Sequence, residues 1–117
     1  MALEWKKCFL SVPLDAQGLS DYDNWSDSDG HIYTVELTVS EYEVLSEVFA
    51  KWNTEFGILI DIFEEETIAV NNVKRALEIL QQHMNFNQRS EFLTAAEKLK
   101  IALAKAVEVH MPLHLDF

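Results

Sequence analysis

Alternation of side-chain type over residues 31–39 (HIYTVELTV) is the feature that most restricts what this chain can fold into. Its five β-branched residues favour an extended backbone, and the alternation places Tyr33, Val35, Leu37 and Val39 on one face of a strand. Such a strand must bury its apolar face, and a sheet with fewer than three strands is marginally stable in water. We therefore expect the rest of the chain to supply at least two more strands and a layer that covers them.

Segments near the two ends of the chain show the same alternation of apolar and polar side chains. Residues 5–12 (WKKCFLSV) and 113–117 (LHLDF) both alternate, and Pro13 and Pro112 mark where these segments end or begin. Their apolar positions are Cys8, Leu10 and Val12 in the first segment and Leu113, Leu115 and Phe117 in the second. We expect both segments to join residues 31–39 in a small antiparallel sheet, with a buried, unreactive thiol at Cys8.

Helical periodicity dominates the middle of the chain. Residues 40–52 open with SEYE, which is typical of a capping box in which Ser40 and Glu43 each accept a backbone N–H of the other. Apolar residues recur at three- and four-residue spacing over residues 72–85 and 90–109. The pattern predicts a helix in each of these three segments.

Residues 54–69 fit two structures. Phe56, Leu59, Ile60 and Phe63 have helical spacing, whereas ILIDIF-EEE-TIAV also fits a hairpin. We favour a helix near 54–69, because a Glu-Glu-Glu turn holds no residue suited to positive φ. With three to four helices packed on one small sheet, the predicted fold class is α+β.

Length and composition indicate a single domain over residues 1–117. A chain of 117 residues with 49% hydrophobic content can bury a sizeable core, and its one cysteine excludes an internal disulfide. The apolar part of residues 1–14 is shorter than a secretory signal core, and no stretch approaches the roughly 20 apolar residues that cross a bilayer. We therefore expect a cytoplasmic protein.

Charge divides the chain into an acidic part and a nearly neutral part. The net charge of −11 splits into −5 over residues 1–39 (seven acids, two lysines), −7 over residues 40–70 (eight acids, one lysine) and +1 over residues 71–117 (five acids, six bases). A field of this sign repels phosphate backbones and anionic membranes. We expect no nucleic-acid or membrane binding, and the acids form either a solubilising face or a surface for a basic partner.

Residues 21–36 (DYDNWSDSDGHIYTVE) pose the question of a calcium loop. Aligned on Gly30, four positions match the EF-hand pattern, but Trp25 stands where the first oxygen ligand belongs. The matching positions are Asp27, Asp29, Ile32 and Glu36. In a strand, Glu36 would lie about 20 Å from Gly30 at roughly 3.3 Å per residue, too far to complete a calcium shell. We interpret residues 14–30 as a loop that ends in an Asp-Gly turn, with a calcium site at 25–36 as the alternative.

Catalytic chemistry finds little support in the sequence. His110, His114 and Asp116 would need a continuous helical face to bind zinc together, and Pro112 interrupts it. We expect His110 at a helix C-terminus and His114 exposed on the last strand. The EEE run is typical of a solvated face rather than of an acid–base pair. We predict no enzymatic activity, no cofactor and no metal.

Binding of a basic protein is the remaining hypothesis. Two aromatic residues among the aspartates of residues 21–29 would anchor a partner whose lysines and arginines pair with the carboxylates, unless Trp25 instead covers the sheet edge. The economical form is a small acidic module of the immunity type, an inhibitor that masks its partner. The expected partner-binding residues are Asp21, Tyr22, Asp23, Trp25, Asp27, Asp29, Glu43, Glu47, Glu64, Glu65 and Glu66.

Two competing hypotheses stay open. The first is a homodimer, a structural or regulatory domain that self-associates through the apolar side of residues 90–109, and the second is an enzyme whose site uses dispersed residues. Salt distinguishes the first of these from the inhibitor, because an acidic inhibitor loses association rate as ionic strength rises and an apolar homodimer does not.

Overall fold

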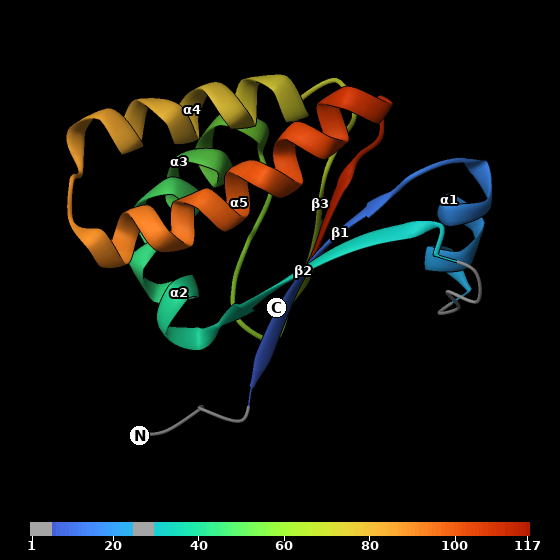
Figure 1. Cartoon of the computed structure of the whole chain (residues 1–117), viewed down its shortest axis with the longest axis horizontal. Coiled ribbons are helices and arrows are strands. Elements are labelled where there is room, and N and C mark those ends of the chain that lie inside the picture. Colours follow the sequence, from blue (N-terminus) through green and yellow to red (C-terminus); the bar gives the residue numbers. More distant parts are fainter. Residues whose placement is uncertain (1–5, 25–29) are drawn as a thin grey trace.

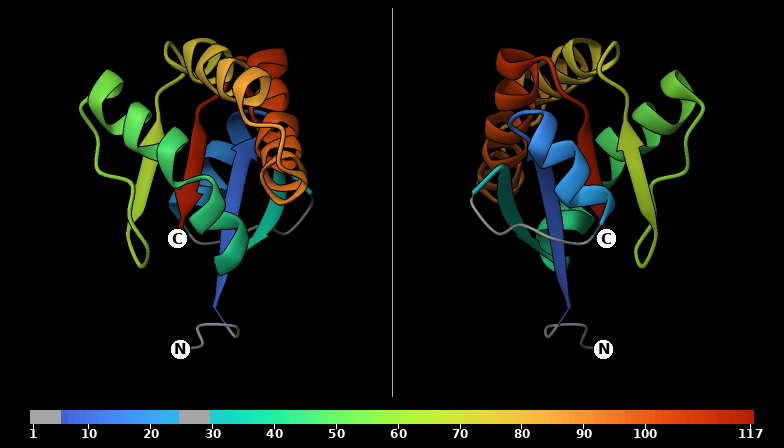
Figure 2. Two further views of the ribbon diagram at one scale, coloured as in Figure 1. Left: turned by 90° about the vertical axis from the view of Figure 1, so that its left-hand side faces the viewer. Right: turned by 90° about the vertical axis from the view of Figure 1, so that its right-hand side faces the viewer.

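A four-stranded antiparallel sheet with helices on both faces forms the framework of the computed structural model, which describes residues 6–24 and 30–117 (Figure 1). The strands are β1 (Lys7–Pro13), β2 (Ile32–Thr38), β3 (Glu65–Ile68) and β4 (Leu113–Asp116), in the order β2-β1-β4-β3. The helices are α1 (Ala16–Asp23), α2 (Val39–Val44), α3 (Ser46–Phe56), α4 (Val73–Phe86) and α5 (Ser90–Val109). Helices α2 to α5 lie on one face of the sheet and α1 lies on the other (Figures 1 and 2). The predicted α+β class is confirmed.

Strand register directs one apolar face of the sheet toward α2 to α5. Leu10 in β1 lies opposite both Val35 in β2 and Leu115 in β4, and Leu115 lies opposite Glu66 in β3. Leu10 and Leu115 are fully buried, as is Cys8 two residues before Leu10. Helix α5 covers this face with seven buried residues, Phe92, Ala95, Ala96, Leu99, Ala102, Leu103 and Ala106. The small alanines let the helix approach the sheet closely.

Periodic segments were predicted well. The strands expected near 5–12, 31–39 and 113–117 are β1, β2 and β4, and the helices expected near 72–85 and 90–109 are α4 and α5. Burial of Cys8 is confirmed, and this burial raises the pKa of its thiol. His110 is the C-cap of α5, as predicted, in a left-handed conformation. No helix in the described part of the chain is long and apolar enough to cross a membrane.

The preferred helix over residues 54–69 is wrong. Helix α3 ends at Phe56 because Gly57 adopts positive φ (65°) as its C-cap, and β3 begins at Glu65. The strand pairs with β4 and not with residues 57–62, so the hairpin alternative is wrong as well, although it placed extended chain after the glutamates. The backbone of this segment has positive φ at Phe63 (67°), directly before the three glutamates.

Two further segments differ from the predictions. Helix α1 replaces part of the loop expected over 14–30, because the Asp15 carboxylate caps it by accepting the Gly18 N–H at 2.9 Å. The helix expected over 40–52 starts earlier and breaks into α2 and α3 at Leu45. Its capping box is formed by Thr38 and Glu41 rather than by Ser40 and Glu43.

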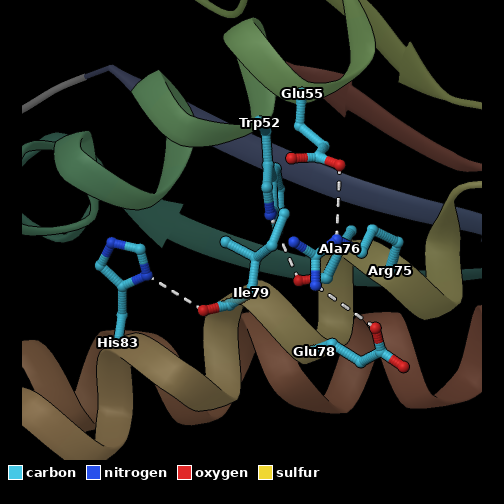
Figure 3. Close-up of polar contacts among 7 residues, drawn as sticks. All are labelled: Trp52, Glu55, Arg75, Ala76, Glu78, Ile79 and His83. Carbon is cyan, nitrogen blue, oxygen red and sulfur yellow. Dashed lines mark hydrogen bonds and ion pairs between the residues drawn. The ribbon is translucent and has the colours of Figure 1, made fainter.

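Polar contacts join α3 to α4 (Figure 3). The indole N–H of the fully buried Trp52 donates to the Ala76 carbonyl at 3.2 Å. The Arg75 guanidinium lies between the carboxylates of Glu55 (3.4 Å) and Glu78 (3.5 Å). Trp52 therefore fixes α3 on α4 by a directed bond as well as by its volume.

We expect Trp52→Phe to lower the free energy of unfolding by about 2 kcal/mol, because it removes both the buried indole bond and part of the buried ring system. Urea denaturation followed by circular dichroism measures this loss. Leu59→Ala, which truncates a side chain that is 65% exposed, serves as the control and is expected to change stability by no more than about 0.5 kcal/mol. Equal stability of the Trp52 variant and the wild type would contradict the assigned contact.

Candidate partner-binding surface

The loop between α3 and β3 holds two large apolar side chains in water. Leu59 is 65% exposed and Phe63 is 59% exposed, with Asp61 between them and Glu64 and Glu65 directly after. The loop runs beside β3 at the edge of the sheet (Figure 2). Isolated exposed apolar residues are ordinary, but two of them on one short loop among carboxylates resemble the anchors of a binding surface.

Side-chain hydrogen bonds fix the backbone of this loop. Asn53 binds Ile60 twice, accepting the Ile60 N–H at 2.7 Å and donating to the Ile60 carbonyl at 3.4 Å. Glu66 accepts the Leu59 N–H at 3.1 Å, and the Phe117 N–H donates to the Glu64 carbonyl at 3.2 Å. These bonds hold the loop against α3, β3 and the end of β4, so Leu59 and Phe63 project from an ordered backbone.

Phe63 adopts a left-handed backbone conformation with φ at 67°. A bulky residue pays about 1–2 kcal/mol for this conformation, because its Cβ approaches the following carbonyl oxygen. Burial of the ring does not offset this cost, because Phe63 is largely exposed. The contact recorded for the ring is with the Lys6 ammonium, which lies 5.1 Å from its centroid. Backbone strain of this kind is concentrated at functional sites, so Phe63 is a candidate binding residue.

Most carboxylates around the loop form no ion pair with the described residues. Of the eight acids in residues 40–70, Glu41 pairs with Lys98 at 2.8 Å and Glu55 pairs with Arg75 at 3.4 Å. The other six form no ion pair within the described part of the chain: Glu43, Glu47, Asp61, Glu64, Glu65 and Glu66. We call Glu43, Leu59, Asp61, Phe63, Glu64 and Glu65 together the acidic loop surface.

Two hollows flank this surface. One, of about 410 Å³, is lined by Val39, Tyr42, Glu43, Ser46 and Ile62. The other, of about 310 Å³, lies on the open face of the sheet, where its lining includes Phe63, Glu64 and Glu65 together with the two lysines of the first strand region. The loop therefore separates an acidic hollow on the α2 side from a mixed-charge hollow on the α1 side.

The other predicted residues lie outside the acidic loop surface, at several places along the chain. Glu47 is exposed on α3, one turn after Glu43, whereas Glu66 is half-buried and accepts backbone N–H groups. Asp23 is exposed at the end of α1. Trp25, Asp27 and Asp29, at the first, third and fifth places of the calcium-loop alternative, lie outside the described residues. Glu36, which would close that loop, lies in β2 with its carboxylate 3.7 Å from the Lys7 ammonium.

Asp21 and Tyr22 face the sheet and do not face solvent. Tyr22 stacks on His114 with ring centroids 3.7 Å apart, and its hydroxyl donates to Asp116 at 3.0 Å. Burial and the Asp116 charge raise the pKa of Tyr22. Asp21 is 4% exposed and accepts from Gln17 at 2.6 Å. We leave both residues out of the acidic loop surface because neither is free to meet a partner while α1 is docked.

The prediction that His114 is exposed is wrong. Its side chain lies on the face of the sheet that carries α1, which we call the open face because α2 to α5 cover the other one. Tyr22 stacks on the imidazole there and leaves His114 8% exposed. Its Nδ1 lies 3.0 Å from Thr67 Oγ1, while its Nε2 is buried without a hydrogen-bond partner among the described residues, as is Asp21 Oδ2. Burial lowers the pKa of His114, against smaller opposing effects of Asp116 and Asp23. No group of three metal-ligating side chains occurs within the described ranges.

Sequence patterns missed Leu59 and Phe63 as surface residues. Their helical spacing indicated a buried stripe, and nothing in periodicity distinguishes a buried apolar residue from an exposed one. Gly57 was the available signal, because a glycine after a helical run predicts a helix end. Comparisons of this chain with protein-family models, curated proteins and solved structures find no match.

We expect the free energy of unfolding to fall as pH falls below about 6.5. The folded-state pKa of His114 is lowered from 6.5, so the unfolded chain binds more protons in this range and is favoured. Urea denaturation between pH 5 and 8 measures the slope. His114→Asn should reduce it, whereas His110→Asn, at the exposed end of α5, should preserve it. An unchanged slope in the His114 variant would show that other titrating groups cause the pH dependence of stability.

A second expectation concerns backbone strain at Phe63. At ordinary φ, alanine is at least as stabilising as glycine, but at positive φ glycine avoids the Cβ clash. Phe63→Gly should therefore be more stable to urea than Phe63→Ala by about 1 kcal/mol. Both variants lose the ring, so their difference reports the backbone alone. The opposite order would show that residue 63 leaves the left-handed region in solution.

Proposed function

We propose that the protein is a binding module that docks a basic partner protein on its acidic loop surface, in the manner of an immunity-type inhibitor covering a basic active site. One observation carries the proposal: Leu59 and Phe63 are held in water on a fixed, strained loop, among carboxylates that form no ion pair with the described residues. Apolar anchors within a charged rim are the composition of a protein interface.

The two components of this surface have different roles. The unpaired carboxylates attract a positively charged partner over distance and raise the association rate. Leu59 and Phe63 enter pockets on the partner, exclude water and slow dissociation. Because the loop is already fixed by Asn53 and Glu66, little conformational entropy is lost on binding.

The geometry favours this role over self-association through α5. The apolar side of α5 is used inside the protein, where seven of its residues are buried against the sheet and α4. Ile101 is the α5 residue among the exposed large hydrophobic side chains, at 45% exposure. A single apolar side chain on a charged helix is a poor basis for a stable dimer.

A non-catalytic role is part of the proposal. The polar groups that come closest to a catalytic arrangement are Thr67, His114 and Asp116 on the open face of the sheet. Their contacts connect α1 to β4, since Tyr22 covers His114 and binds Asp116. An acid–base residue needs access to a reacting group, and α1 stands in the way.

Photo-crosslinking in cells that express the protein tests the proposed surface. A photoreactive phenylalanine analogue replaces Leu59 in one variant and Ile101 in a matched control, since both positions are exposed but lie on different faces. We expect a basic protein to crosslink from position 59 and not from position 101. Crosslinking from both positions or only from position 101 would overturn the assignment.

Binding kinetics of the captured protein then separate the two roles. We expect Glu64→Gln with Glu65→Gln to lower the association rate severalfold at low salt, with the difference vanishing near 1 M salt, where charges are screened beyond about 3 Å. Phe63→Ala should instead raise the dissociation rate at least tenfold. Glu91→Gln with Glu97→Gln removes the same charge from α5 and serves as the control. Rates indifferent to salt and to these substitutions would contradict the proposal.

A further inference from the structure

The hollow on the α2 side has the walls of a pocket for one long side chain. Tyr42 and Glu43 both lie three or four residues from Val39 and from Ser46, so the four residues line one face of α2 and the start of α3. Ile62 closes the opposite side from the α3–β3 loop. Its volume of about 410 Å³ lies within the usual range for ligand pockets.

Tyr42 gives the hollow a rigid aromatic wall. Its ring packs on Phe49 with centroids 5.6 Å apart and on Phe117 at 5.3 Å, so it is supported from behind by the core. Its hydroxyl donates to Asp61 Oδ1 at 3.4 Å. Burial, followed by the Asp61 charge, raises the pKa of Tyr42, which keeps the hydroxyl protonated as a donor.

Glu43, which lines this hollow, and Asp61, which binds the Tyr42 hydroxyl beside it, are open to a cation. Glu43 is exposed, and its carboxylate makes no ion pair or hydrogen bond with the described residues. Asp61 uses Oδ1 for the Tyr42 hydroxyl and for the Ile62 N–H at 2.8 Å, and its Oδ2 accepts no hydrogen bond from the described chain. One carboxylate comes from α2 and the other from the facing loop.

In the other two hollows, positive charge from this chain already lies close to the carboxylates. The hollow between α2 and the start of α5, about 350 Å³, includes Glu41, which binds Lys98 at 2.8 Å, and Glu91, which is stabilised by the positive end of α5. The hollow on the open face of the sheet is lined by Lys6 and Lys7. At the Tyr42 hollow, by contrast, no lysine or arginine is among the lining residues, and the lining carboxylate of Glu43 forms no ion pair with the described residues.

We infer that the hollow at Tyr42 receives an arginine side chain of the basic partner, whose guanidinium binds Glu43 and Asp61. This inference rests on the proposed function. Val39 and Ile62 contact the aliphatic stem, and the guanidinium plane lies against the Tyr42 ring. Arginine fits better than lysine because its planar fork presents donors in two directions to two carboxylates and stacks on an aromatic face.

Small probes test this pocket without any partner. N-acetylarginine amide is titrated into the full chain at low salt and the backbone N–H resonances are followed by NMR, with N-acetylcitrulline amide as the uncharged probe of the same shape. We expect saturable shifts around Tyr42, Glu43 and Ile62 with the arginine probe, at a dissociation constant on the order of millimolar, and much smaller shifts with citrulline.

Charge variants give the matched comparison. Glu43→Gln should weaken the arginine probe about two- to fivefold, which is the effect of one exposed ion pair. Glu97→Gln removes the same charge from the exposed side of α5 and should leave the affinity unchanged. Shifts centred on another surface, equal affinity for the citrulline probe, or no effect of the Glu43 substitution would overturn the inference.

These outcomes are independent of the partner experiments. If the probe binds at Tyr42 but no basic protein crosslinks from position 59, the pocket stands and the proposed function fails. If a basic protein crosslinks from position 59 and its affinity is the same for wild type and Glu43→Gln, the function stands and the arginine pocket fails.

Discussion

The central position of β4 holds the layers of this protein together. Residues 113–116 pair with β1 on one side and with β3 on the other, so the edge strand β3 reaches the sheet only through β4. On one face, Leu113 and Leu115 are fully buried against the helices. On the other face, His114 and Asp116 hold Tyr22 of α1 by a ring stack and a hydrogen bond. One short strand therefore fixes both layers and the edge that carries the acidic loop surface.

Dependence on β4 explains how an unfavourable loop stays ordered. The α3–β3 loop combines exposed apolar side chains, clustered like charges and positive φ at Phe63, each of which costs stability. Its ends are fixed from outside: Asn53 on α3 binds Ile60, and the Phe117 N–H just after β4 binds Glu64. The surrounding structure therefore stabilises a loop whose own sequence and backbone conformation are unfavourable. Such locally unfavourable positions are where functional sites are expected.

Sequence reasoning succeeded where periodicity was long and failed where single side chains decided the backbone. Helix α5 has twenty residues of consistent spacing and was predicted with its observed bounds. The loop after α3 depends on Gly57 as a cap and on Asn53 reaching seven residues along the chain, and no hydrophobic pattern encodes either. Helix α1 was missed because it is short and polar, and its stability comes from docking Tyr22 on His114, a contact between residues far apart in the chain. The same limit applies to the surface: Glu43, Glu64 and Glu65 could be proposed from charge, but Leu59 and Phe63 could not be distinguished from core residues.

Charge clustering also links binding to the stability of the free protein. Six carboxylates between residues 43 and 66 lack cations within the described chain, and their mutual repulsion opposes the compact state. A basic partner would remove this repulsion as it forms new ion pairs, so part of the binding free energy would be relief of a cost already present in the free module. Lysines distributed among these glutamates would stabilise the isolated fold but would weaken its attraction for a basic surface. On the proposed function, the acidic loop surface is therefore better suited to a complex than to the free protein.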